Sequence, residues 1–133
     1  MTTELYWLIL TIFLTSILWL PYIVKRLAEH GPLTALWDPD GETWTEAPWA
    51  KRLMSAHANA VENLVIFAPL VIIAHILGIS TELTQLAAVL YFFSRLAHAI
   101  LFTLRTPILR IISFAAGVIA QMIMIFTLLG WIN

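Results

Sequence analysis

The sequence predicts an all-helical integral membrane protein in which four transmembrane helices form a bundle. Of its 133 residues, 61% are hydrophobic and only 11% are charged, and the mean hydropathy is +0.90. A soluble domain of this size could not bury so much apolar surface. Backbone groups in lipid must form their hydrogen bonds within one segment, which favours helices over open strands. We expect a single membrane domain covering residues 1–133.

Four long apolar segments are the expected spans, at about residues 5–27, 49–77, 83–104 and 107–131. Twenty residues at a rise of about 1.5 Å each cover roughly 30 Å, which is the thickness of the hydrocarbon layer. The first segment lacks a basic region before it, so it is expected to be a span rather than a cleaved signal sequence.

Local signals mark the ends of these segments. Gly31-Pro32 should stop the first helix, because proline cannot donate the next helical hydrogen bond. Ser80 is expected to cap the third helix. Thr106-Pro107 is expected to start the fourth, since proline is well tolerated at the first helical position.

The basic residues are distributed asymmetrically. They flank the first connection (Lys25, Arg26, Lys51 and Arg52) and the third connection (Arg105 and Arg110). The positive-inside rule therefore places these two connections in the cytoplasm and both termini outside. The net charge of −1 gives no indication of a nucleic-acid partner, and the absence of cysteine excludes disulfides, thiolate metal ligands and a cysteine nucleophile. The histidines have no metal-ligand spacing, so no metal site is expected.

Two ionisable residues, Glu62 and Arg95, lie deep in the apolar segments. A charge at the bilayer centre costs about 2.5–3.5 kcal/mol even on lenient scales, so such residues usually face the bundle interior and pair. We expect Glu62 and Arg95 to pair across the second and third spans. As an isolated pair they fit a packing clamp as well as a ligand site.

Helical spacing extends the set of polar residues. Steps of three, four or seven are expected to align one stripe on the second span (Arg52, Asn59, Glu62, Asn63 and Ile66) and another on the third (Arg95, His98 and Phe102). With Arg110 at the start of the fourth span, they would form a polar seam that enters from the cytoplasmic side. So many buried donors exceed what a clamp needs and favour an anionic ligand with several carboxylates.

Two motifs within these spans resemble a known family. The run Arg52…Ala56-His57-x-Asn59-x-x-Glu62-Asn63…Phe67 is similar to the signature of the MAPEG family, the membrane-associated proteins in eicosanoid and glutathione metabolism. Arg95-x-x-His98, followed by Arg110, resembles the third and fourth helices of the same family. The resemblance covers essentially the whole chain and is nearest to bacterial members. It implies a homotrimer in the bacterial inner membrane, with a glutathione site between neighbouring subunits that opens toward the cytoplasm.

The resemblance also implies roles for individual residues. Asn59 and Glu62 would bind the polar ends of glutathione, the co-substrate, while Arg95 and His98 would line the same site. Arg52 would be a supporting basic residue. Arg110 would be the catalytic residue, because a guanidinium near the sulfur favours the thiolate. The implied function is that of a microsomal-type glutathione transferase or peroxidase, acting on lipophilic electrophiles or hydroperoxides that arrive from the bilayer lipids.

Two departures from the family pattern keep a second interpretation open. Phe102 stands where many family enzymes carry a tyrosine that contacts glutathione, and Ala58 stands where several relatives carry an arginine. Each lost contact would cost about 1–3 kcal/mol if its partner stayed buried and unpaired. The alternative is a non-enzymatic MAPEG-like membrane protein that binds a lipid or another anion. A small transporter is a weaker option, because the seam enters from one side only and the fourth span offers little polar lining beyond Gln121.

Overall fold

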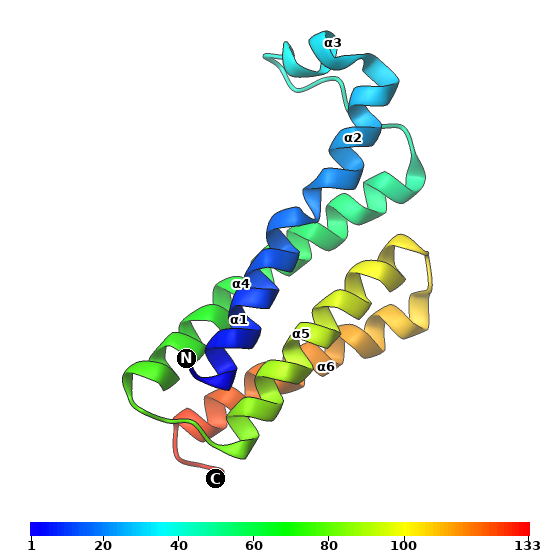
Figure 1. Cartoon of the computed structure of the whole chain (residues 1–133). Coiled ribbons are helices and arrows are strands. Elements are labelled where there is room, and N and C mark those ends of the chain that lie inside the picture. The colour runs from blue at the N-terminus through cyan, green and yellow to red at the C-terminus, as the bar shows by residue number, and fades with distance from the viewer.

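The computed structural model describes all 133 residues, and every regular element in it is a helix. Four helical segments are long and apolar enough to cross a membrane, namely Thr3–His30, Pro48–Ile76, Glu82–Thr103 and Pro107–Leu128. They run alternately up and down, and both termini lie at the same end of the bundle (Figure 1). The predicted all-helical membrane fold of four long helices is confirmed.

The first segment consists of two helices, α1 (Thr3–Ile17) and α2 (Trp19–His30), which meet at Leu18. Pro21 explains the break, because it has no N–H to donate to the carbonyl four residues earlier. As expected, α2 ends at Gly31, whose φ of +79° is a conformation that glycine adopts without strain. The short helix α3 (Pro32–Leu36) follows directly.

The other spans are α4 (Pro48–Ile76), α5 (Glu82–Thr103) and α6 (Pro107–Leu128). The prediction that Ser80 caps α5 is wrong. Thr81 is the N-cap: its hydroxyl accepts a bond from the Thr84 amide at 3.2 Å, and the Thr84 hydroxyl accepts one from the Thr81 amide at 2.8 Å. Ser80 instead donates to the buried carboxylate of Glu4 at 3.0 Å, which ties α1 to the start of α5.

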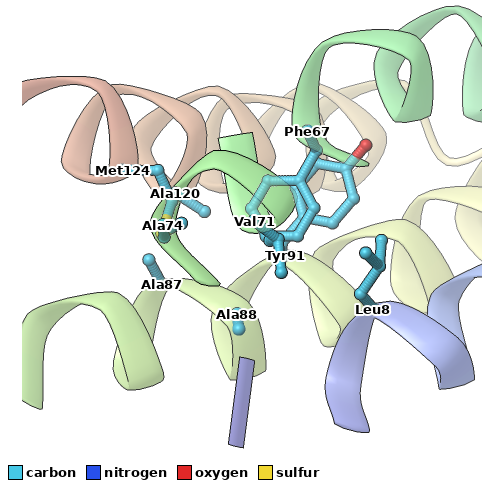
Figure 2. Packing of buried hydrophobic residues seen from close by; sticks show 9 residues of the cluster. All are labelled: Leu8, Phe67, Val71, Ala74, Ala87, Ala88, Tyr91, Ala120 and Met124. Carbon is cyan, nitrogen blue, oxygen red and sulfur yellow. The ribbon is translucent and has the colours of Figure 1, made fainter. Parts of the chain in front are cut away.

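The core lies where α1, α4, α5 and α6 meet, and Figure 2 shows its packing. The rings of Phe67 and Tyr91 stack with their centroids 3.7 Å apart. Alanines fill much of the remaining core (Ala74, Ala87, Ala88 and Ala120). Small residues let helix backbones approach closely. In a lipid bilayer, where no hydrophobic effect drives helices together, this close packing stabilises their association.

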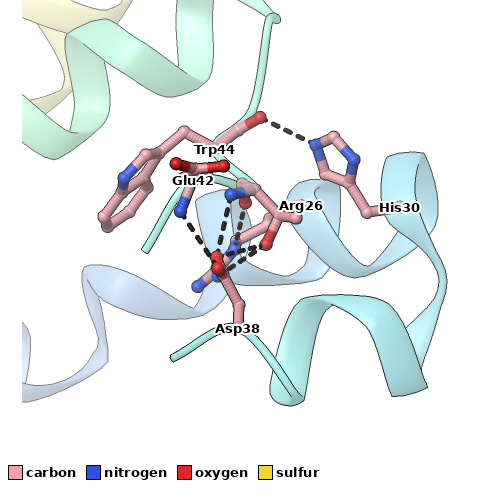
Figure 3. A network of polar contacts seen from close by, with 6 residues as sticks. Arg26, His30, Asp38, Glu42 and Trp44 are labelled. Carbon is pink, nitrogen blue, oxygen red and sulfur yellow. Dashed lines mark hydrogen bonds and ion pairs between the residues drawn. The ribbon is translucent and has the colours of Figure 1, made fainter. Parts of the chain in front are cut away.

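The connection between α2 and α4 is folded, and it lies at the end of the bundle opposite the termini (Figures 1 and 3). Arg26 donates to the Asp38 carboxylate at 3.0 Å and lies over the Trp44 ring at 5.0 Å. Two hydrogen bonds from Thr43 lower the pKa of Asp38 to about 2. The bond from the Thr43 hydroxyl has the larger effect, and the bond from the Thr43 amide has the next largest. The long first connection is therefore an ordered cap on the end of the bundle that carries most of the basic residues.

Candidate functional site

Arg95 is the most deeply buried basic residue, with only 2% of its surface exposed. Its guanidinium donates to the side-chain oxygen of Asn59 at 3.3 Å and to the carbonyl of Phe114 at 3.2 Å. The rings of Tyr91 and Phe114 lie 5.5 and 5.4 Å from its Cζ. The charge is thus held between α4, α5 and α6 by neutral oxygens and aromatic faces.

Glu62 does not pair with Arg95, so the predicted ion pair across the second and third spans is wrong. The chain contains three ion pairs, Lys25–Glu29, Arg26–Asp38 and Lys51–Glu46, and none of them involves either residue. Glu62 is exposed on the surface of α4. Successive helical residues are turned by about 100°, so the position next to the buried Asn63 points away from the bundle.

The expected stripe on α4 is therefore divided between two faces. Asn59 points toward Arg95, and Asn63 is buried against α6, where its carbonyl accepts a bond from the side chain of Gln121 at 3.2 Å. Glu62 and Ile66 are exposed. A second pattern on α4 distinguishes the buried face from the exposed one. Residues spaced three or four apart form the buried face, and this set includes Asn63 but not Glu62 (Ala56, Ala60, Asn63, Phe67, Val71 and Ala74).

His98 and Arg110 meet where α5 and α6 approach their connection. The Nδ1 of His98 donates to the Arg110 carbonyl at 3.0 Å, which leaves its Nε2 buried without a hydrogen-bond partner. The Arg110 guanidinium lies 4.7 Å from the centroid of the Phe102 ring and is partly exposed. This end of the bundle therefore has one unpaired imidazole nitrogen and one guanidinium without a carboxylate.

Arg52 lies apart from this group, at the boundary between α4 and α5. Its Nε donates to the carbonyl of Thr103 at 2.8 Å, near the C-terminal end of α5, where a positive charge complements the helix dipole. Its two terminal nitrogens make no hydrogen bond within the chain. The structure thus joins Asn59 to Arg95 and His98 to Arg110, and it leaves Glu62 and Arg52 on two other surfaces.

Gly117 is a residue that the sequence analysis missed. A Cβ at this position would lie 2.2 Å from Nη2 of Arg95 and 2.9 Å from the Ser94 hydroxyl. Because Gly117 has no side chain, α6 leaves space for the guanidinium of Arg95. The available signal was a glycine inside a long apolar helix, which costs helical stability and usually has a packing reason.

Tyr22 was also missed. Its hydroxyl and Nδ1 of His57 are joined by a hydrogen bond of 2.8 Å, which connects α2 to α4 below the folded cap. His57 therefore has a structural partner within the chain.

Taken together, the four spans and these buried polar groups define an integral, multi-pass membrane protein with a polar interior near one end. The family model for the MAPEG family matches residues 5–130, which is nearly the whole chain. The chain therefore belongs to the MAPEG family, as its motifs indicated. No curated protein and no solved structure matches it.

Proposed function

We propose that this protein is a glutathione-dependent transferase or peroxidase that acts on lipophilic electrophiles or hydroperoxides, as a homotrimer in the bacterial inner membrane. Both termini would lie outside the cytoplasm. All seven lysines and arginines except Arg95 belong to the end of the bundle opposite the termini, which supports this orientation through the positive-inside rule.

The exposed carboxylate of Glu62 is the observation that carries the proposal. It lies on a membrane-spanning helix and has no ionic partner within its own subunit. An ionised carboxylate facing acyl chains is unfavourable, and such residues usually line a polar cavity or pair with another group. A neighbouring subunit, with a polar ligand between the two, would remove Glu62 from the lipid.

The remaining polar groups fit glutathione, which carries two carboxylates, one ammonium group and a thiol. Glu62 suits the ammonium group. The side-chain oxygen of Asn59 accepts a hydrogen bond from Arg95, so the side-chain nitrogen of Asn59 remains available to donate to a carboxylate of the ligand. The unpaired Nε2 of His98 and the partly exposed guanidinium of Arg110 are further groups that a polar ligand would satisfy. Phe102, by contrast, offers only a ring face.

The chemistry would use the thiol of glutathione as the nucleophile, since the chain has no cysteine. The role of Arg110 is to favour the thiolate, because an opposite charge stabilises the ionised form. Arg95 would add positive potential from behind Asn59 without touching the sulfur. The second substrate would reach the thiolate laterally from the bilayer.

Thermal unfolding of the detergent-purified protein, titrated with glutathione, tests the proposal. Saturation at a hundred times Kd should stabilise the protein by about 2.7 kcal/mol. An analogue with a methyl group in place of the thiol should stabilise it comparably but give no conjugate with a generic electrophile. Glu62→Gln should lose most of the shift, whereas Glu82→Gln, an exposed acid at the other end of the bundle, should keep it. No shift with glutathione at millimolar concentration would reject the assignment.

A non-enzymatic protein that binds an anion or a lipid is the second candidate, favoured by the contact between Arg110 and Phe102. A guanidinium stacked on a phenyl ring is already partly satisfied by the ring face. Arg110→Ala separates the two candidates. In the enzyme it should abolish thiolate formation, measured by absorbance of the bound thiolate, while in the non-enzymatic protein it should leave ligand binding and stability nearly unchanged.

A further inference from the structure

An apolar groove runs along the bundle surface where the first span and α4 separate from α5. Its volume is about 340 Å³, within the range of small-molecule sites. Three spans line it, with Leu14 and Leu18 from the first, Trp49 and Leu53 from α4, and Ile100 and Thr103 from α5. It lies within a single subunit, on a different face of α4 from Glu62.

The exposed surface of the groove is apolar. Thr103 contributes the only side-chain hydroxyl, and that hydroxyl donates to the carbonyl of Ala99 at 2.7 Å. A polar guest would therefore lose its hydrogen bonds with water and gain none. Every lining residue belongs to a membrane-spanning segment or directly adjoins one, so the hydrocarbon of the bilayer is the surrounding phase.

The groove is elongated and ends beside basic residues. On α5 its lining extends from Leu96 to Leu104, which is about 12 Å at the helical rise of 1.5 Å per residue. Arg52 donates to the carbonyl of Thr103 at this end and keeps its two terminal nitrogens free. Arg105, the residue after Leu104, is exposed and forms no ion pair in the subunit. The apolar groove thus ends close to Arg52, and Arg105 directly follows its last lining residue; neither guanidinium has a carboxylate partner in the chain.

We propose that this groove binds one acyl chain of an anionic membrane phospholipid, whose phosphate is held by Arg52 and Arg105. The charge is complementary, and a guanidinium can bind two phosphate oxygens at once. Glu62 lies ten residues beyond Arg52, about 15 Å along α4, so the lipid site is separate from the proposed glutathione site. In this assignment Arg52 is a lipid ligand rather than a support for glutathione.

Native mass spectrometry of the protein, released from nanodiscs with equal amounts of phosphatidylglycerol and phosphatidylcholine of identical chains, tests the lipid site. We expect one retained phospholipid per subunit, with phosphatidylglycerol preferred. Arg52→Gln should reduce that preference roughly fivefold, the effect of one basic residue near an anionic surface. Thr103→Trp, which fills the groove, should lose most of the bound lipid, while Ile111→Trp on the exposed face of α6 should keep it. Equal retention by the two tryptophan variants would overturn the assignment.

Photo-crosslinking identifies the occupant of the groove directly. Ile100 lines the groove and is half exposed, so benzoylphenylalanine at this position would contact whatever lies there. An adduct with the mass of one phospholipid supports the proposal. A crosslink between two copies of the chain would instead make the groove a subunit interface, and would reject it. Glutathione binding by Thr103→Trp should be unchanged, so failure of the lipid site and failure of the glutathione site are distinguishable.

Discussion

Replacing Gly117 with alanine tests how the buried charge of Arg95 is held. The new methyl group would lie 2.2 Å from Nη2 and 2.8 Å from Cζ, distances at which atoms overlap. The guanidinium would have to move, although it is buried and bonded to Asn59 and Phe114. It would move away from the Phe114 carbonyl, to which Nη2 donates at 3.2 Å.

The size of the effect follows from three contributions. A hydrogen bond to a charged group is worth about 1.5–3 kcal/mol, and overpacking adds about 1–3 kcal/mol. Alanine gains about 1 kcal/mol over glycine in a helix interior. The net destabilisation should therefore be roughly 1.5–5 kcal/mol. It can be measured from the helical circular dichroism signal while dodecyl sulfate unfolds the protein in detergent micelles.

The same substitution in an Arg95→Lys background is the matched control. Lysine has no planar fork and no atom where Nη2 lies, and its Nζ, which takes the place of Cζ, is a single atom on a flexible stem, so the methyl group should meet little. Gly117→Ala should then be neutral or stabilising by up to about 1 kcal/mol, from helix propensity alone. A thermodynamic cycle gives the coupling between the two sites. Equal destabilisation in both backgrounds would show that the methyl group clashes with something other than the guanidinium.

Three further predictions concern other polar contacts. Thr84→Val removes the hydroxyl that donates to the buried Glu4 carboxylate at 2.5 Å, and it should cost about 1–3 kcal/mol in the same unfolding assay; a loss below 0.5 kcal/mol, on the order of a surface change, would contradict this role. Gln121→Leu should cost only about 0.6 kcal/mol, the average for a hydrogen bond between membrane helices, and a loss above about 2 kcal/mol would contradict it. Asp38 has a folded pKa of about 2 against an ordinary 3.8, so its contribution to the cap is complete above about pH 4 and is lost as the pH falls toward 2. Hydrogen exchange of the Thr43 amide should accelerate over that window, and Asp38→Asn should show fast exchange at neutral pH; exchange that does not depend on pH in the native chain would refute the role.

Local chemistry in the sequence was enough to predict the fold. The apolar lengths fix four helices, the proline and glycine positions fix where the first one ends, and the basic residues mark one end of the bundle. The N-cap of α5 was assigned one residue too early, because Ser80 and Thr81 are both good caps. Thr84, three residues after Thr81, favours Thr81 by completing a reciprocal pair of cap hydrogen bonds, and the Glu4 carboxylate, 76 positions from Ser80, engages the Ser80 hydroxyl instead.

The candidate site was harder to predict, because it depends on how far each helix is rotated about its own axis. On α4, the packing of small residues determines this rotation. Ala56 and Ala60 are buried against the neighbouring helices, and Asn63, which lies on the same face, is buried with them. A spacing of three or four residues predicts that Glu62 lies in the same stripe as Asn59. The two side chains differ in direction by about 60° around the helix axis, and this difference is enough to leave Glu62 on the surface. Knowing which residues are polar did not determine which of them face each other.

The separation of Arg95 from Glu62 leaves one charged residue buried within the chain and one exposed on a membrane-spanning helix, and the chain stabilises only the buried one by itself. Arg95 is stabilised by carbonyl and amide oxygens, two ring faces and the space left by Gly117, so it needs no carboxylate. Glu62 has none of these in its own chain. A mutual clamp would have neutralised both residues and left nothing for a ligand. Because α4, α5 and α6 together satisfy Arg95, the Glu62 carboxylate has no ionic partner in the chain, which is what the proposed ligand site requires.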